Sequence, residues 1–291
     1  MNSKKGHSIV IPLMGGLGNQ LFQFAAALHL RKFKGFKVIF ADWTAMGTMY
    51  STKRHLAIGS LIERADFQLQ NTYPKTLARL ISKVSKNIVY WESMPSDRLL
   101  STAITNQKIA VGFFQIADVV ESVSEELIEL ITSSNFFPGL ISDAPNKKVA
   151  VHVRYGDYLN NKKTRRYHGL STESYYIDSV IELATELSID KALFVTDNID
   201  QLHLDYRGFF SKTNLEIATT QSADPFIDFV QIANCKGIVA SNSSYSWWAA
   251  WFGHNLYQSR ITIPKPWLSK YSNYDRTIPK ETWTVRERSI K

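Results

Sequence analysis

Short apolar segments alternate with amphipathic segments along the chain, and this alternation restricts the possible folds more than any other feature. Apolar runs of strand length occupy 8–13, 37–41, 108–113, 148–154, 192–196, 237–240 and 260–263. Segments with helical spacing of apolar residues lie between them, at 19–32, 118–132, 172–187, 224–233 and 243–251. Alternating strands and helices are typical of parallel sheets with helices on both faces. The sequence therefore predicts an α/β protein.

Two of these helices begin at recognisable capping sequences. Glu121 follows Asp118 by three residues, which is the pattern of a capping box. Asp224 precedes Pro225, so a cap stands before a proline at the first helical position. We expect helices to start at both places.

A turn-rich stretch at 135–148 gives the best position for a domain boundary. It contains Pro138, Gly139 and Pro145 between a predicted helix and a strongly apolar predicted strand. The chain has 291 residues, and a typical domain has about 150. We expect an N-terminal domain over 1–143 and a C-terminal domain over 144–291.

The chain is basic, with 34 Lys and Arg against 26 Asp and Glu and a formal net charge of +8. Such a charge favours anionic partners: nucleotides, nucleic acids or acidic membrane surfaces. The single cysteine, Cys235, excludes a disulfide framework and a cysteine-based metal site. No apolar run approaches the roughly 18 residues of a membrane-spanning helix, and the first one is too short for a secretory signal. We therefore expect a cytoplasmic protein.

A basic amphipathic segment at 75–86 bears on that localisation. Its apolar residues share one helical face, and its Lys and Arg residues lie on the other. The more common interpretation is a surface helix packed on its own core. The alternative is peripheral contact with the inner membrane surface.

A glycine-rich turn, GGLGNQ at 15–20, follows the first predicted strand and opens a helix. Backbone N–H groups in such a turn can approach an anion or a sugar closely. The turn is not a dinucleotide fingerprint, because Leu21 stands where a third glycine is needed. A plain tight turn is the alternative, but Asn19 and Gln20 beside the glycines favour ligand contact.

A His-x-Arg pair, His152 and Arg154, ends a predicted central strand. Residues two apart in a strand project to the same face, and ligands bind at the carboxyl ends of parallel strands. The arginine fork suits a phosphate. Asp157 is a candidate to orient Arg154 or to act as a base, and a structural Arg154–Asp157 ion pair with a core histidine is the alternative.

Three further segments carry polar residues at strand ends. SNSS at 241–244 leads into a helix with three tryptophans that we expect to be core residues, and its hydroxyls exceed what a helix cap needs. Asp197 ends another strand, either as a helix cap or as an acid that contacts a ribose or purine. The basic segment 161–168 is a solvated turn or, alternatively, a lid over an anionic substrate.

Many nucleotide-sugar enzymes bind a divalent metal ion through an Asp-x-Asp motif. This sequence contains no Asp-x-Asp. It contains no His-Glu-x-x-His, Gly-x-Ser-x-Gly or cysteine pair. We expect no metal and no cofactor.

Three motifs together resemble those of the bacterial α-1,2-fucosyltransferases: GGLGNQ (15–20), HVRYGDY (152–158) and SNSSYSWW (241–248). They occur in the order of that family and span residues 15 to about 253. The resemblance implies a GT-B-like fold of two facing Rossmann-type domains. It also implies metal-free, inverting transfer of L-fucose from GDP-β-L-fucose to the 2-hydroxyl of galactose. The acceptor would be a galactose-terminated glycan or lipid-linked oligosaccharide, as in O-antigen assembly.

The resemblance also implies roles for individual residues. Arg154 would grip the β-phosphate of the donor beside His152, and Asp197 would contact the guanosine. The remaining donor contacts would come from the N-terminal domain and from the helix start, namely Gly16, Gly18, Asn19, Ser243, Ser244 and Tyr245. The family usually has a second arginine where this chain has Tyr155, which puts donor affinity in question.

In such an enzyme, Arg154 would stabilise the negative charge that grows on the departing GDP, and Asn19 would reach the same junction when the domains close. The main alternative donor is a related GDP-6-deoxyhexose. Two other classes of protein stay open. A non-catalytic nucleotide- or sugar-binding module is one, and a nucleic-acid-binding protein is the other. The scattered Lys and Arg residues argue against nucleic acid.

Overall fold

The computed structural model describes the chain except for residues 1–6, 47–53, 71–88, 92–107, 157–158 and 160. The chain divides into two compact units, Met1–Phe136 and Phe137–Lys291. We call them the N-terminal unit and the C-terminal unit. The division lies at the start of the turn-rich stretch, a few residues before position 143. The basic amphipathic segment at 75–86 lies outside the described residues.

The described strands of the N-terminal unit form one parallel sheet in the order β3-β2-β1-β5-β4. The strands are β1 (Ser8–Leu13), β2 (Lys37–Asp42), β3 (Gln68–Gln70), β4 (Val89–Trp91) and β5 (Ile109–Val111). The helices are α1 (Leu17–Lys34), the 3-10 turn Thr44–Met46, α2 (Gly59–Arg64), α4 (Ala117–Glu121) and α5 (Ser124–Ser133). The first strand is central, and α1 packs on β1 and β2.

The strands of the C-terminal unit form a second parallel sheet in the order β11-β10-β9-β6-β7-β8. They are β6 (Asn146–Val153), β7 (Lys191–Thr196), β8 (Glu216–Thr220), β9 (Cys235–Val239), β10 (Arg260–Lys265) and β11 (Thr284–Glu287). The helices are α7 (Lys162–His168), α8 (Glu173–Leu187), α9 (Ile199–Phe210), α10 (Pro225–Ala233), α11 (Ser244–Tyr257) and α12 (Tyr274–Thr277).

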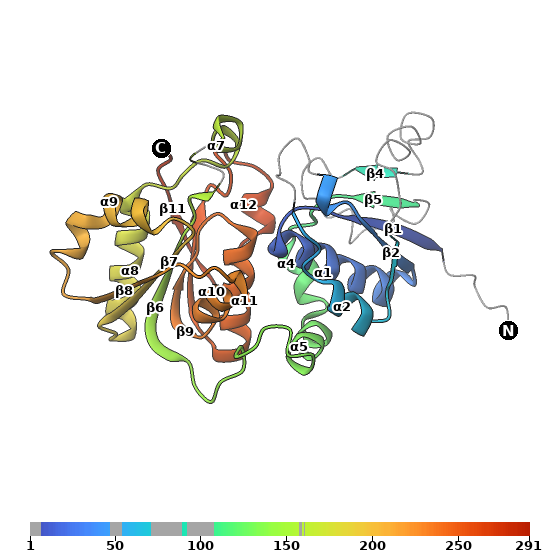
Figure 1. The fold of residues 1–291 in the computed structure, drawn as a ribbon, viewed down its shortest axis with the longest axis horizontal. Coiled ribbons are helices and arrows are strands. Elements are labelled where there is room, and N and C mark those ends of the chain that lie inside the picture. Colours follow the sequence, from blue (N-terminus) through green and yellow to red (C-terminus); the bar gives the residue numbers. More distant parts are fainter. Residues whose placement is uncertain (1–6, 47–53, 71–88, 92–107, 157–158, 160) are drawn as a thin grey trace. The chain divides into compact units, whose positions relative to one another are not determined.

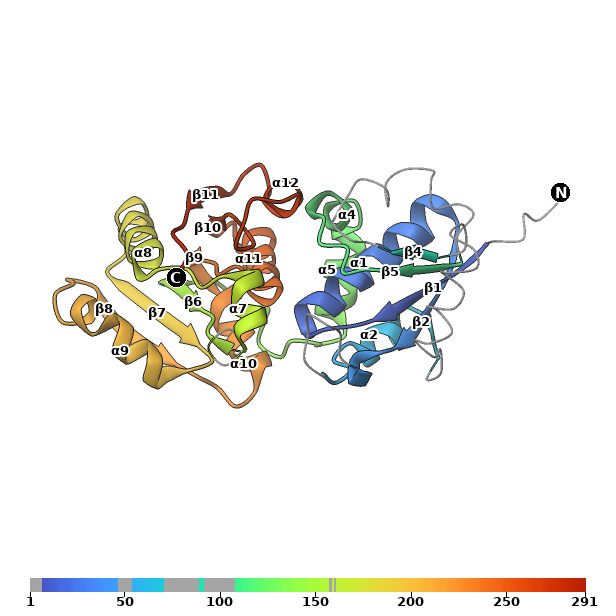
Figure 2. The same cartoon turned by 90° about the horizontal axis from the view of Figure 1, so that it is seen from above.

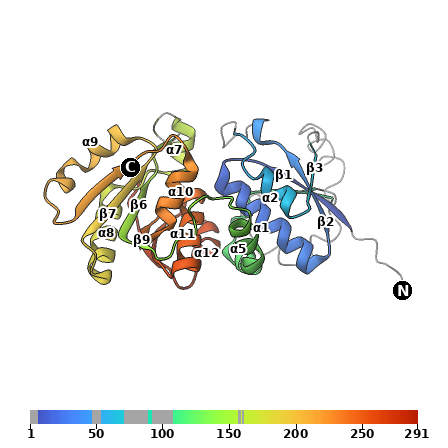
Figure 3. The same ribbon diagram turned by 60° about the horizontal axis from the view of Figure 1, so that its bottom comes forward.

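This strand order is that of a Rossmann fold, and it reverses direction between β6 and β9. Helices α8 and α9 lie on one side of the sheet, and α10 and α11 on the other (Figure 1). Figure 3 shows β6 between β7 and β9 in the middle of the sheet. Ligands of open parallel sheets bind outside the strand ends at such a reversal. The prediction of two α/β units with parallel sheets is confirmed.

The core of the C-terminal unit confirms the prediction for the three tryptophans. Trp247, Trp248 and Trp251 are fully buried, and the Trp247 indole N–H donates to the Ile278 carbonyl at 2.7 Å. Large buried aromatic side chains supply much of the hydrophobic free energy of a core. The tryptophans therefore stabilise the helix that carries SNSS at its start, and they form no ligand platform.

Of the two predicted capping sequences, one is confirmed and one is wrong. The Asp224 carboxylate accepts from the Phe226 N–H at 2.8 Å, and Pro225 opens α10. Asp118 is no cap, because α4 begins one residue earlier, after Ile116. The single helix predicted at 118–132 breaks at Ser122, whose hydroxyl donates to the Val119 carbonyl at 2.6 Å. A side chain that bonds the backbone locally competes with helix continuation.

The solvated turn predicted at 161–168 is also wrong, because the segment forms helix α7. The Asn161 side chain caps it by accepting from the N–H groups of Lys163 and Thr164, at 3.0 and 3.1 Å. Figure 2 shows α7 beside the end of β6. The basic residues gave no apolar periodicity, so only the asparagine cap signalled this helix.

Candidate functional site

The glycine turn of the N-terminal unit, Gly15 to Asn19, follows β1. Gly15 has φ +76°, and a Cβ built there would lie 2.5 Å from Asn19 Nδ2. Both the left-handed conformation and the close approach require glycine. Gly16 is the N-cap of α1, and Gly18 is buried in its first turn. The turn is thus shaped to bring the Asn19 amide close over the backbone.

A hydrogen bond sets the orientation of the Asn19 amide. Its Oδ1 accepts from Gln115 Nε2 at 2.8 Å, and Gln115 is nearly buried. Because the oxygen is the acceptor in this bond, Nδ2 is the end of the amide that can donate to a ligand. Gln115 was missed by sequence reasoning, since it lies 96 residues from Asn19.

Two fully buried glutamines brace the glycine turn. Gln23 accepts from the Met14 N–H at 3.0 Å and donates to the Gly112 carbonyl at 2.7 Å. Gln20 donates to the Gly15 carbonyl at 2.9 Å, and it also bonds the backbone of His55 and Ala57. Buried amides with complete hydrogen bonding rigidify their surroundings.

Arg54 directly precedes the backbone that Gln20 anchors at His55 and Ala57. Its Nε lies 3.9 Å from where a Cβ on Gly16 would be. A cationic side chain therefore stands beside the glycine turn, a residue that sequence reasoning did not single out.

The His-x-Arg pair of the C-terminal unit lies at the carboxyl end of β6. His152 is 4% exposed, its Nδ1 hydrogen-bonds the Ser241 hydroxyl at 3.0 Å, and its ring centroid lies 5.4 Å from that of Tyr245. Burial lowers the pKa of His152 to about 4, with the Arg154 charge acting in the same direction and Asp197 opposing it. The imidazole is therefore neutral at physiological pH.

Arg154 pairs with Asp197, at 2.5 Å between Nη1 and Oδ2. The other Asp197 oxygen accepts from the Tyr155 N–H at 2.9 Å. Asp197 is not a helix cap, because Asn198 caps α9 by accepting from the Gln201 N–H. The Arg154 side chain is 30% exposed, so a ligand can reach the guanidinium. Asp157 lies outside the described residues.

A glycine also lies beneath the arginine. Gly156 has φ +39°, and a Cβ built there would lie 2.8 Å from Cζ, Nε and Nη2 of Arg154. The guanidinium thus folds back over the turn that follows its own strand.

Some of the polar residues at 241–246 make structural hydrogen bonds, and others are partly exposed at the start of α11. The Ser246 hydroxyl accepts from the Ser241 N–H at 3.0 Å, and Asn242 Nδ2 donates to the His168 carbonyl at 3.0 Å. Ser243 is the N-cap of α11 but makes no side-chain capping bond, and Ser244 is the first helical residue. Both are partly exposed at the positive end of a 14-residue helix.

Tyr245, in the first turn of α11, contacts the start of α10, and Asp228 of α10 lies nearby. The Tyr245 hydroxyl donates to the Pro225 carbonyl, which ties α11 to α10. Burial, and then the nearby Asp228 charge, raise the pKa of Tyr245. Asp228 is itself 8% exposed and accepts from the Ser222 N–H. Sequence reasoning missed this acid, whose signal was a carboxylate within an apolar helical segment.

A buried arginine fastens the neighbouring backbone. Arg288 is 6% exposed, and its guanidinium donates to the Pro266 carbonyl at 2.6 Å and to the His168 carbonyl at 2.9 Å. Because Asn242 donates to the same His168 carbonyl, Arg288 and Asn242 together hold the end of α7 against the polar segment. Nothing in the local sequence near residue 288 marks this role.

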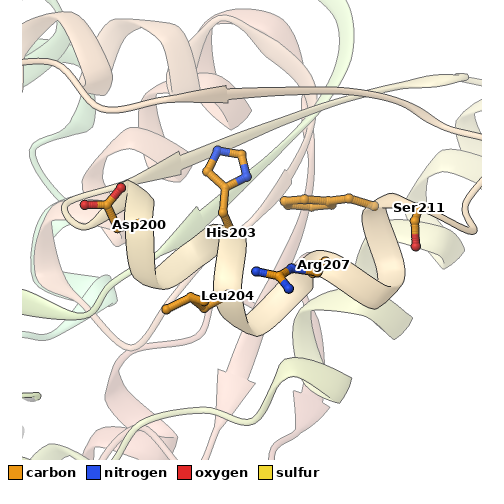
Figure 4. Close-up of a pocket in the computed structure, with 6 residues that line it drawn as sticks. Asp200, His203, Leu204, Arg207 and Ser211 are labelled. Atoms are coloured by element: carbon orange, nitrogen blue, oxygen red, sulfur yellow. The ribbon is translucent and has the colours of Figure 1, made fainter.

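The described part of the C-terminal unit contains cavities of different kinds. One of about 150 Å³ borders Arg154 and Tyr155. Another, of about 600 Å³, is an open groove along α9 (Figure 4), and its lining residues include exposed Leu204 and Arg207. None of the residues predicted from sequence lines the groove, so it is not the candidate site.

Among the described residues, no three or more His, Cys, Asp or Glu side chains gather as metal ligands would. The same residues include no helix with the length and apolarity needed to cross a membrane.

The sequence profile of Glycosyl transferase family 11 matches residues 5–284 of this chain. The chain belongs to this family, and it is a glycosyltransferase. It is 27% identical to an alpha-1,2-colitosyltransferase of Escherichia coli, over 90% of this chain and 93% of the relative. It is 23% identical to the Escherichia coli O-antigen biosynthesis glycosyltransferase WbnK, over 93% of this chain and 98% of the relative.

More distant similarity extends to other transferases. A human galactoside alpha-(1,2)-fucosyltransferase 1 is 25% identical over 43% of this chain and 35% of its own length. The crystal structure of NodZ alpha-1,6-fucosyltransferase with GDP aligns with a TM-score of 0.46 and 14% identity, over 89% of this chain and 94% of that one.

Proposed function

We propose that this glycosyltransferase moves L-fucose from GDP-β-L-fucose to the 2-hydroxyl of a galactose residue in a glycan, with inversion and without a metal. The observation that carries the proposal is Arg154, a partly exposed guanidinium fixed by Asp197 at the carboxyl end of β6. It lies where the strand order reverses, which is the position of nucleotide sites in such sheets.

Arg154 would bind the β-phosphate of the donor. Cleavage of the sugar–phosphate bond leaves negative charge on GDP, and a preorganised guanidinium stabilises the charge that grows in the transition state. Asp197 occupies one terminal nitrogen and holds the group in place. Asp197 therefore orients Arg154, the proposed ligand of the β-phosphate. This role is separate from the contact with guanosine that the resemblance implies.

His152 and the start of α11 would complete the phosphate site. A neutral imidazole can hydrogen-bond a phosphate oxygen, and its Ser241 partner fixes the ring. The N–H groups and hydroxyls at Ser243 and Ser244 add donors at the positive end of the helix. In the N-terminal unit, Asn19 Nδ2 is a preset donor for the sugar or the acceptor.

The experiment is a transfer assay with purified chain and a panel of donors: GDP-fucose, GDP-colitose, GDP-mannose and UDP-galactose. The acceptors are a β-galactoside and its 2-deoxy analogue, with the product linkage read by NMR. We expect transfer from GDP-fucose, an α-1,2 linkage, and no product on the 2-deoxy acceptor. Product on the 2-deoxy acceptor would refute the 2-hydroxyl assignment, and tight donor binding without turnover would identify a non-catalytic module.

GDP-colitose is the second candidate donor. The favouring observation is the similarity to an alpha-1,2-colitosyltransferase across nearly the full length of both chains. Colitose lacks the 3-hydroxyl of fucose, so the two donors differ by one polar group. A higher kcat/KM for GDP-colitose than for GDP-fucose in the same assay would replace fucose with colitose as the donor.

A further inference from the structure

Tyr155 lies next to Arg154 but faces a different part of the C-terminal unit. Its side chain is 5% exposed and packs in the hydrophobic core, and its hydroxyl donates to Asp205 Oδ2 at 2.9 Å. Asp205 lies on α9, 50 residues away. Tyr155 therefore connects the end of β6 to a helix on one face of the sheet.

Tyr155 also makes a hydrogen bond through its backbone. The Tyr155 N–H donates to Asp197 Oδ1, and Asp197 Oδ2 holds Arg154. Asp197 follows β7 and Asp205 belongs to the helix that comes next. Residue 155 is thus attached at two points, backbone and side chain, to one β7–α9 segment.

The Asp205 carboxylate is itself fixed by other groups. Gln201 Nε2 donates to its Oδ1 at 2.8 Å, and Lys291 Nζ lies 3.7 Å from its Oδ2. Lys291 also pairs with Glu173 at the start of α8. A carboxylate held from two sides is a rigid acceptor for the Tyr155 hydroxyl.

We propose that Tyr155 is a positioning residue for the transfer reaction, whose hydroxyl bond to Asp205 fixes the turn that aims the Arg154 guanidinium. The proposal rests on the proposed function of Arg154. Arg154 and Tyr155 both border the 150 Å³ cavity, so a released tyrosine ring has space to move. Movement of residue 155 would shift the preceding residue, and small misplacements of a catalytic group reduce rate strongly.

The test compares four single variants of the full chain: Tyr155→Phe, Asp205→Ala, Asp205→Asn and Tyr257→Phe. Tyr257 is the matched control. Its hydroxyl donates to the Leu140 carbonyl at 2.5 Å, at the far end of α11, about 20 Å along that helix from the candidate site. Tyr155→Phe loses one hydrogen bond, Asp205→Ala loses two, and Tyr257→Phe loses those of its hydroxyl with Leu140 and Ser142. The melting temperature reports this structural cost for each variant.

We expect Tyr155→Phe and Asp205→Ala each to lower kcat about tenfold with little change in the donor KM. Asp205→Asn keeps an acceptor oxygen and should retain most activity. Tyr257→Phe should lower the melting temperature by a similar amount and leave kcat unchanged. If Asp205→Ala does not fold, the difference in kcat between Tyr155→Phe and Asp205→Asn provides the same test.

A second arm asks whether the effect passes through Arg154. In an Arg154→Lys background, Tyr155→Phe should cause no further decrease in kcat. A full tenfold decrease in that background, or unchanged kcat in Tyr155→Phe alone, would overturn the proposal and leave the proposed function intact. Wild-type chain without transfer from either GDP-deoxyhexose would defeat the proposed function and this inference with it.

Discussion

Two turns in this molecule share one construction and differ in the groups that hold them. Each follows a central strand, β1 or β6, and each has a glycine with positive φ beneath a polar side chain. Gly15 lies beneath Asn19, and Gly156 lies beneath Arg154. The first turn is held by the neutral amides of glutamines, and the second by an ion pair and a buried tyrosine.

We infer from this difference that the two turns have different roles in the proposed reaction. At the first turn, neutral amides orient the Asn19 side chain. A neutral hydrogen-bond donor of this kind suits a sugar hydroxyl. An ion pair at a partly exposed site keeps a guanidinium oriented while leaving it open to a phosphate.

Arg154→Lys should lower kcat at least a hundredfold, because lysine keeps the charge and loses the planar fork. The measurement is transfer from GDP-fucose with melting temperature as the control for folding. Arg260→Lys is a matched variant, since Arg260 pairs with Glu186 at 3.0 Å at the start of β10. Near-wild-type turnover of Arg154→Lys would remove Arg154 from the reaction.

Asn19→Ala should lower kcat about tenfold or more and change the affinity for GDP little. The reason is that Asn19 belongs to the N-terminal unit, whereas the proposed phosphate ligands belong to the C-terminal unit. Calorimetric GDP titration and transfer kinetics on the same preparation separate the two effects. Equal losses in both would assign the glycine turn to nucleotide binding.

The strand end that carries His152 and Arg154 should make the stability of the chain sensitive to acid. The pKa of His152 is about 4 in the folded chain and 6.5 ordinarily, so between these values only the unfolded chain gains a proton. The free energy of unfolding should therefore fall as pH decreases from 6.5, by about 2 kcal/mol at pH 5 from this residue. Melting temperatures between pH 7 and pH 5 measure it.

The control for this effect is His152→Gln, which should flatten the pH dependence. Burial, with the charges of Arg288 and Arg154, lowers the pKa of His168 to about 4 as well, so part of the slope should remain. A slope identical to that of the wild-type chain would mean that His152 gains its proton equally in both states.

The smallest expected effect is that of metal removal. Excess EDTA should leave transfer unchanged, because in the proposed mechanism Arg154 and the start of α11 would supply the positive charge that a divalent cation provides in metal-dependent transferases. Turnover is measured with and without EDTA, then with added Mg²⁺ or Mn²⁺. Loss of activity that one of these ions restores would contradict the prediction.

Sequence patterns located the central elements well. The apolar run at 8–13 is β1 to the residue, and the predicted strands at 148–154 and 192–196 are β6 and β7 with small changes at their ends. The edge strands β8 and β11 were not predicted. Neither strand contains a buried residue, so both lack the apolar signal of a buried strand.

The sequence by itself determined the α/β architecture, the glycine turn and the His-x-Arg strand end, because each depends on residues close together in the chain. Tertiary structure alone decided the partners of these groups. Arg154 pairs with Asp197 and Tyr155 bonds Asp205, across separations for which the chain carries no local pattern. The first pair forms because the parallel strands β6 and β7 bring their carboxyl ends to one edge in a fixed register. The second forms because α9 packs Leu202 and Tyr206 into the same core as Tyr155.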